Sequence, residues 1–160
     1  MGSTSDRPVM EKACKWLDDN EIPFEVNALS AHRTPDAVEA FAKGAQERGI
    51  KVIIAAAGMA AALPGVIAAS TNLPVIGVPI KGMLDGLDAM LSIIQMPPGI
   101  PTATVGVNAA QNAAILAAQI ISLSDSAVAA KVAAHKAGLG AKIEKANKDL
   151  AEVKYNFKTN

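Results

Sequence analysis

The polar segment Ser30-Ala31-His32-Arg33-Thr34-Pro35 carries the residue types best suited to proton transfer and anion binding. The imidazole of His32 exchanges protons near neutral pH, and the guanidinium of Arg33 can bind a phosphate or a carboxylate through two parallel hydrogen bonds. The segment follows a predicted strand and precedes a predicted helix, which is where open α/β sheets bind ligands. A solvated loop in which Thr34 caps a helix begun by Pro35 explains the same residues equally well, so the segment alone leaves both interpretations open.

A second polar segment, Gly2-Ser3-Thr4-Ser5-Asp6, stands directly before a predicted helix. Free N–H groups at a helix N-terminus favour anions, and the hydroxyls of Ser3 and Ser5 add donors. Asp6 could accept hydrogen bonds from sugar hydroxyls. Ser, Thr and Asp are also ordinary capping residues, and capping is the better explanation of this segment taken alone.

Two further segments could line a site. The small residues from 57 to 65 (AGMAAALPG) would let a ligand approach the backbone closely, although a tight strand-to-helix turn is the stronger interpretation of these residues alone. Pro97, Pro98 and Pro101 fix an extended loop after the segment 85–96. Such a loop suits a site, an interface or a plain structural connection, and the sequence does not decide between them.

Alternating strands and helices are expected to position these segments. Helices are predicted at 8–20, 35–48, 63–70, 85–96, 110–123 and 125–153, the last with a break at Gly138-Leu139-Gly140, and strands at 22–29, 51–57, 73–79 and 102–107. The strands at 51–57 and 73–79 are apolar on both faces, as parallel strands usually are. The sequence therefore predicts an α/β fold: a three-layer parallel sheet with helices on both faces, flavodoxin- or Rossmann-like, with a long C-terminal helix.

One strand of that sheet is expected to be missing. In doubly wound folds a Gly/Ser loop of the kind at 2–6 follows a buried strand, and no strand precedes Met1. We therefore expect either that the sheet lacks its first strand or that the natural sequence begins upstream. Residues 1–160 are predicted to form one domain, with an α/β core at 1–123 and a helical extension at 124–160.

Composition narrows the classes of partner. Hydrophobic residues make up 51% of the 160 residues, and 15 basic residues balance 15 acidic ones, which argues against nucleic-acid binding. The single cysteine, Cys14, can form neither an intrachain disulfide nor a cysteine metal site. Without an apolar run of about 20 residues or a signal peptide, we expect no membrane partner and a cytoplasmic location. His135, far from every polar motif, is expected to be a surface or packing residue.

From Gly2 to about Ser122 the chain resembles the N5-carboxyaminoimidazole ribonucleotide mutase family. The resemblance is carried, in order and spacing, by the segments GSTSD, SAHRTP, ALPG, LPVIGVP, LDGLDAMLSIIQMPPGIPTATV and NAAILAAQI. The resemblance implies an isomerase of de novo purine biosynthesis. Such an enzyme moves a carboxylate from the exocyclic nitrogen of an aminoimidazole ribonucleotide to ring carbon C4, with no metal or organic cofactor. The resemblance also implies a homo-octamer whose sites lie between subunits.

The same resemblance implies roles for individual residues. His32 matches the family's general acid/base. The substrate-binding residues that it implies are Ser3, Ser5, Asp6, Ser30, Arg33, Ala57, Gly58, Ala61 and Leu63.

One departure from the family pattern bears on activity. The family's usual turn reads Gly-Gly-Ala-Ala-His-Leu-Pro-Gly, whereas here Ala62 stands at the histidine and Met59 at a glycine. Loss of one polar contact costs on the order of 1–3 kcal/mol. Two alternatives therefore stay open. One is the related aminoimidazole ribonucleotide carboxylase, which takes free CO2 and carries a Ser-Asn-Gly-Leu-Gly type of turn. The other is a non-catalytic nucleotide-binding homologue that has lost a pocket histidine.

Overall fold

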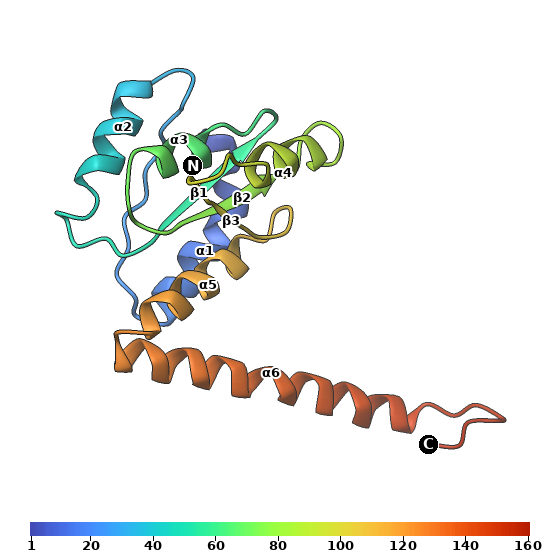
Figure 1. Ribbon diagram of the computed structural model, residues 1–160. Coiled ribbons are helices and arrows are strands. Elements are labelled where there is room, and N and C mark those ends of the chain that lie inside the picture. The colour runs from blue at the N-terminus through green and yellow to red at the C-terminus, as the bar shows by residue number, and fades with distance from the viewer.

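Three parallel strands form the sheet: β1 (Ile53–Gly58), β2 (Val75–Ile80) and β3 (Ala103–Thr104), in the order β1-β2-β3. The computed structural model describes residues 1–160 (Figure 1). β1 pairs with β2 from Ile53↔Val75 to Gly58↔Ile80, and β3 pairs with β2 at Ala103 and Thr104. Every residue of β2 is buried, which explains why its sequence is apolar without alternation.

Helices cover both faces of this sheet. On one face lie α1 (Arg7–Asp19) and α5 (Ala110–Ser122), and on the other lie α2 (Pro35–Gly44), α3 (Leu63–Ala69) and α4 (Leu87–Ile94). A short 3₁₀ helix, η1 (Thr4–Asp6), precedes α1, and α6 (Ser126–Glu152) follows α5. Successive strand residues pack into the two hydrophobic cores on opposite faces of the sheet. Ala56 packs toward α1 and α5, whereas Ala55 packs toward the opposite layer. The predicted three-layer α/β fold is confirmed.

Small residues set the spacing between the layers. A Cβ atom on Gly77, within β2, would lie 2.3 Å from Cγ2 of Ile93 in α4, so a larger residue there would push the helix off the sheet. The buried residues of α5 are all alanines, which brings this helix close to α1 and to the strands. Close approach of backbones is how a chain with 3% aromatic residues fills its interior.

Residues 22–29, predicted as a strand, are extended but belong to no sheet. Apart from one bond that ties Ile22 to α1, their backbone hydrogen bonds go to Met1. The Met1 ammonium donates to the Asn27 carbonyl at 2.9 Å, and the Leu29 amide donates to the Met1 carbonyl at 2.9 Å. The prediction of a strand is therefore wrong, because a strand needs a continuous ladder partner and Met1 supplies one residue. The sheet has no strand between this segment and β1, in agreement with the expected gap.

The helix α6 runs without interruption from Ser126 to Glu152 and projects away from the sheet and its helices (Figure 1). The predicted break at Gly138-Leu139-Gly140 is wrong. A Cβ on either glycine would meet nothing within 4 Å, so no contact bends the helix there, and glycine costs only about 1 kcal/mol in an exposed helix. Near its start α6 packs on α1, where Trp16 Nε1 donates to His135 Nδ1 at 3.3 Å. His135 is thus a packing residue.

The remaining differences from prediction lie at element ends. The helix predicted at 35–48 ends at Gly44, and the chain then turns as far as Gly49, where φ is +83°. The strand predicted at 102–107 is a ladder of two residues. None of the helices is both long enough and apolar enough to cross a membrane.

Candidate functional site

A pocket of about 630 Å³ opens at the carboxyl ends of β1 and β2. Loops that leave neighbouring parallel strands converge at this edge of a sheet, which is why ligands bind there. The candidate acid/base His32 and every candidate substrate-binding residue lie around this one pocket. The residues that line it are Gly2, Ser3, Ser5, Asp6, Ser30, Ala31, His32, Arg33, Ala57, Gly58, Met59, Ala60, Ala61, Ala62, Leu63, Ile80, Lys81 and Gly82.

The loop at 2–6 is fixed by hydrogen bonds among its own residues. The Ser3 amide donates to Asp6 Oδ2 at 3.2 Å, and the Ser5 amide donates to Ser3 Oγ at 3.3 Å. The Ser5 hydroxyl lies 2.9 Å from Ser3 Oγ and 3.3 Å from Asp6 Oδ1. Asp6 is the one charged side chain that is buried. Capping and pocket lining therefore coexist, because Ser3 caps η1 while both serines also line the pocket.

The loop from Ser30 to Thr34 is closed by bonds between its two ends. The Thr34 amide donates to the Ser30 carbonyl at 2.8 Å, and the Ser30 amide donates to Thr34 Oγ1 at 3.0 Å. Thr34 stands at the N-cap of α2, but its hydroxyl bonds to Ser30 instead of a helix amide. The closed loop presents His32 at its exposed tip, where the imidazole takes part in none of these bonds.

Arg33 joins the two polar loops. Its Nε donates to Ser30 Oγ at 3.2 Å, and its Nη2 donates to the Gly2 carbonyl at 3.2 Å. A guanidinium has five N–H donors, so donors remain for a ligand after these two bonds. With the hydroxyls of Ser3 and Ser5 on the same pocket, this arrangement suits a phosphate group.

The turn after β1 shows what the two departures from the family pattern do. Met59 has φ +55°, in the left-handed region, and its side chain is 65% exposed. That backbone conformation costs a residue other than glycine roughly 1–2 kcal/mol, which gives a physical reason for glycine at this position. Ala62 stands at the N-cap of α3 and lines the pocket without a side-chain hydrogen bond.

Lys81 is a pocket residue that sequence reasoning missed. It follows β2 directly; its amide donates to Asn108 Oδ1 at 2.9 Å, and its ammonium lies 2.9 Å from Asp85. The signal was present in the sequence, because a basic residue just after a buried parallel strand obeys the same rule that located the other loops. The proline-rich loop at 95–101 does not line this pocket.

The pocket therefore combines two cationic side chains, Arg33 and Lys81, with serine hydroxyls and one imidazole. Such a set can bind an anionic ligand that carries hydroxyl groups and can move a proton to or from it. No group of three or more His, Cys, Asp or Glu side chains is arranged to hold a metal ion.

Known proteins are similar to this chain in sequence and in architecture. A family model described as AIR carboxylase matches residues 1–142. The chain is 60% identical over 124 residues to the N5-carboxyaminoimidazole ribonucleotide mutase of Pyrococcus abyssi, over 77% of this chain and 71% of that protein. It is 56% identical over 133 residues to a phosphoribosylaminoimidazole carboxylase of Saccharomyces cerevisiae, over 82% of this chain and 23% of that protein.

A solved structure agrees with these matches. The crystal structure of Treponema denticola PurE superposes with a TM-score of 0.82 and 31% identity over 94% of each chain. The flavodoxin-like three-layer arrangement is therefore shared along nearly the whole length. Together with the family match over residues 1–142, this shows that the chain belongs to the AIR carboxylase family.

Proposed function

We propose that this chain is an N5-carboxyaminoimidazole ribonucleotide mutase, an isomerase of de novo purine biosynthesis that acts in the cytoplasm. The observation that carries the proposal is the convergence of two polar loops and one exposed imidazole on a single pocket. The substrate has matching parts: a phosphate, ribose hydroxyls and an imidazole ring that exchanges a proton for a carboxylate at C4.

The polar loops bind the ribose phosphate in this proposal. Arg33 is already oriented by its bonds to Ser30 and Gly2, so little side-chain freedom is lost when phosphate binds. Ser3 and Ser5 donate hydroxyl hydrogen bonds to the phosphate, and the oxygens of Asp6 accept from the ribose. The small residues Ala57, Gly58 and Ala61, with Leu63, leave room for the aminoimidazole ring against the backbone.

His32 carries the proton transfers. The bond between the carboxylate carbon and the exocyclic nitrogen breaks, and the nitrogen takes a proton from His32 as CO2 is released. Ring carbon C4 then attacks the carbon of CO2, and His32 takes back the C4 proton as the aromatic ring is restored. The net change moves one carboxylate and one proton in opposite directions, so the imidazole ends as it began.

This reaction needs a pocket that holds CO2 against escape to water. In the isolated chain, His32, Arg33 and Met59 are exposed, so a further surface has to cover them. We assign that surface to a neighbouring subunit of a homo-octamer. The apolar residues on and before α4 support assembly, because Met83, Leu84, Leu87, Leu91 and Ile94 are 45–73% exposed.

The free half of α6 supports assembly independently. Its apolar residues Leu139, Ile143, Ala146 and Leu150 follow the spacing of four, three and four that places one seam along a helix. The large ones are 51–65% exposed. An unpartnered seam on a projecting helix is suited to packing against a second copy.

A spectroscopic assay of the purified chain with N5-carboxyaminoimidazole ribonucleotide, without added bicarbonate, tests the proposal beside the variant His32→Asn. The variant should lose about 10²–10⁴-fold in kcat, while substrate affinity stays within about tenfold, because the loss falls on proton transfer. Near-normal turnover by His32→Asn would refute the assigned role.

A second candidate is the carboxylase reaction, favoured by the match to the yeast carboxylase. This candidate would be selected if the protein turned over aminoimidazole ribonucleotide only with added bicarbonate and did not turn over N5-carboxyaminoimidazole ribonucleotide. Tight substrate binding by a folded oligomer with no turnover of either compound would instead select a non-catalytic homologue, as the alanine at position 62 suggests.

A further inference from the structure

The two cationic side chains of the polar pocket, Arg33 and Lys81, lie on opposite sides of it. The Gly2 amide bonds to Ala56 of β1, and β1 pairs with β2, so the loop at 2–6 lies two strand positions away from the end of β2. Two such positions span about 10 Å. Arg33 donates to the Gly2 carbonyl on the first side, whereas Lys81 follows β2 on the other.

The substrate of the proposed function also carries an anionic group at each end. Its phosphate is on the ribose, and its carboxylate is on the aminoimidazole. Arg33 and the hydroxyls of Ser3 and Ser5 account for the phosphate, which leaves the carboxylate without a cationic partner. Among the residues that line the pocket, Lys81 is the one lysine or arginine that remains for it.

Position 62 does not supply a partner for the carboxylate. Ala62 lines the pocket with a methyl group, where the family pattern has a histidine. Gly58 pairs with Ile80 at the ends of β1 and β2, so the turn at 59–62 and Lys81 leave the sheet next to each other. The flexible four-carbon stem of Lys81 can therefore bring its ammonium to the side of the pocket that Ala62 lines.

The present partner of the Lys81 ammonium can be exchanged for a ligand. The ammonium lies 2.9 Å from Asp85, and the two side chains are 58% and 87% exposed. Exposed ion pairs of this kind contribute little to stability. The loop that carries Asp85 is also strained, because Leu84 and Asp85 have φ +46° and +55°, which is unfavourable for residues other than glycine. A carboxylate within the pocket can therefore displace Asp85.

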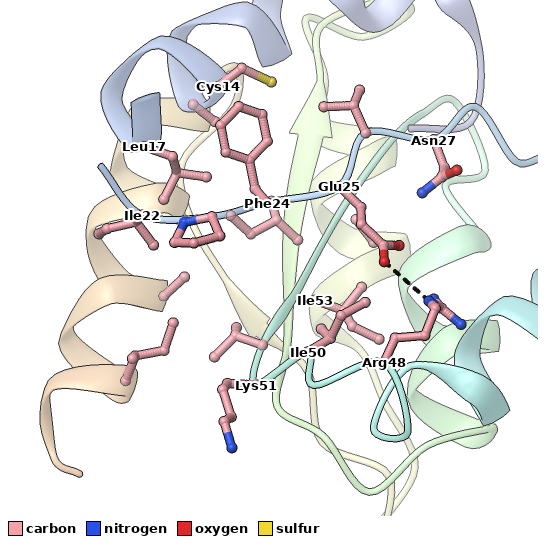
Figure 2. Close-up of a pocket in the computed structure, with 18 of the residues that line it drawn as sticks. Cys14, Leu17, Ile22, Phe24, Glu25, Asn27, Arg48, Ile50, Lys51 and Ile53 are labelled. Carbon is pink, nitrogen blue, oxygen red and sulfur yellow. Dashed lines mark hydrogen bonds and ion pairs between the residues drawn. The ribbon is translucent and has the colours of Figure 1, made fainter. Parts of the chain in front are cut away.

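Arg48 shows how a cation with a structural role differs from Lys81. Figure 2 shows Arg48 in an ion pair with Glu25, in which Nε lies 3.1 Å from Oε1. The guanidinium also donates to the Phe41 carbonyl and lies 5.0 Å from the centre of the Phe41 ring. These contacts hold Arg48 from several directions, whereas the Lys81 ammonium has one exposed carboxylate beside it.

We propose that Lys81 is a specificity-determining residue that binds the carboxylate of the carboxylated ribonucleotides and so distinguishes them from aminoimidazole ribonucleotide. Its ammonium leaves Asp85 and donates to the carboxylate oxygens, at the end of the pocket where position 62 offers no imidazole. Lys81 and Arg33 then hold the two ends of the ligand, while His32 moves the proton. This assignment rests on the proposed function and names the group that binds the second anionic end of its substrate.

Calorimetry with two nucleotides that differ by the carboxylate tests the assignment. Lys81→Met should weaken binding of 4-carboxyaminoimidazole ribonucleotide about tenfold, because a hydrogen bond between charged groups is lost, and should change binding of aminoimidazole ribonucleotide by less than about twofold. Lys81→Arg should keep most of the preference for the carboxylated nucleotide. The matched control is Lys43→Met, which removes the same charge from an exposed position outside the pocket and should leave both dissociation constants unchanged.

Asp85→Asn tests the exchange of partners in the opposite direction. Removal of the competing carboxylate frees the Lys81 ammonium, so 4-carboxyaminoimidazole ribonucleotide should bind about twofold to fivefold more tightly. The double variant Lys81→Met, Asp85→Asn should lose this gain, because the two residues act through one contact.

The outcomes separate this assignment from the proposed function. If Lys81→Met left the ratio of the two dissociation constants unchanged, the assignment would be wrong and the proposed function would stand. Equal loss of affinity for both nucleotides would place Lys81 at the phosphate and would also overturn the assignment, as would a gain in Asp85→Asn that persists without Lys81. Failure of the unaltered chain to bind either nucleotide would refute the proposed function, and the role of Lys81 with it.

Discussion

Replacement of Met59 by glycine should stabilise the protein, even though it removes a side chain. Met59 has φ +55°, a conformation that costs residues other than glycine roughly 1–2 kcal/mol. Against this gain, glycine lowers the free energy of unfolding by about 0.5–1 kcal/mol, because it gives the unfolded chain greater conformational freedom. Because the Met59 side chain is 65% exposed, little burial is lost. The net expected gain in the free energy of unfolding is about 0.5–1 kcal/mol.

The gain is measured by urea denaturation and by thermal melting at one fixed protein concentration, since an oligomer's stability depends on concentration. For a chain of this length, the expected rise in Tm is about 1–4 °C. The matched control is Met59→Ala, which removes the same exposed side chain but keeps a Cβ in the left-handed region. Equal stability of the two variants, or a loss in Met59→Gly, would refute the argument from backbone strain.

Three further predictions concern the pocket and the chain's first residue. Arg33→Ala should raise the substrate dissociation constant about 10–100-fold, because a charge-assisted pair with the phosphate is lost. The constant of Arg33→Lys should lie between those of Arg33→Ala and the unchanged protein. An unchanged constant for Arg33→Ala, measured by calorimetry, would contradict the phosphate role. Ala62→His should raise turnover about fivefold or more if the absence of an imidazole at this position lowers activity. No gain in the mutase assay would mean that another group supplies the contact. The third follows from the burial of the Met1 ammonium, which lowers its pKa below the ordinary 8.0, so the unfolded chain binds more protons just below that pH. The free energy of unfolding should therefore rise as the pH increases toward about 8, and N-terminal acetylation should flatten the rise measured by urea denaturation.

Local patterns determined most of the elements. The strands β1 and β2 and the helix α5 were identifiable from their apolar runs. An uninterrupted apolar stretch bounded by turn residues is most stable as a buried element of an α/β protein. The loops at 2–6 and 30–34 were identifiable from residue type and from their positions next to helices. Their side chains meet in one pocket because the strand ends bring the loops together.

What the sequence did not predict depends on contacts between residues far apart in the chain. Residues 22–29 have the composition of a strand, but a strand exists only when a neighbouring segment completes its ladder, and the bonds from this segment to Met1 involve that one residue. The helical pattern predicted α4, but the face that it buries depends on the layers around it, and the fold buries Ala89 and Ile93 while Leu87 and Leu91 stay about half exposed.

The sequence by itself therefore determined the order of the elements, the apolar strands and the polar loops that could do chemistry, because these depend on neighbours within a few residues. Tertiary structure alone decided that Arg33 bonds to Gly2 and that Lys81 joins the pocket. Each of these depends on contacts between residues far apart in the chain, whose positions follow from sheet pairing and layer packing, and no local pattern encodes them.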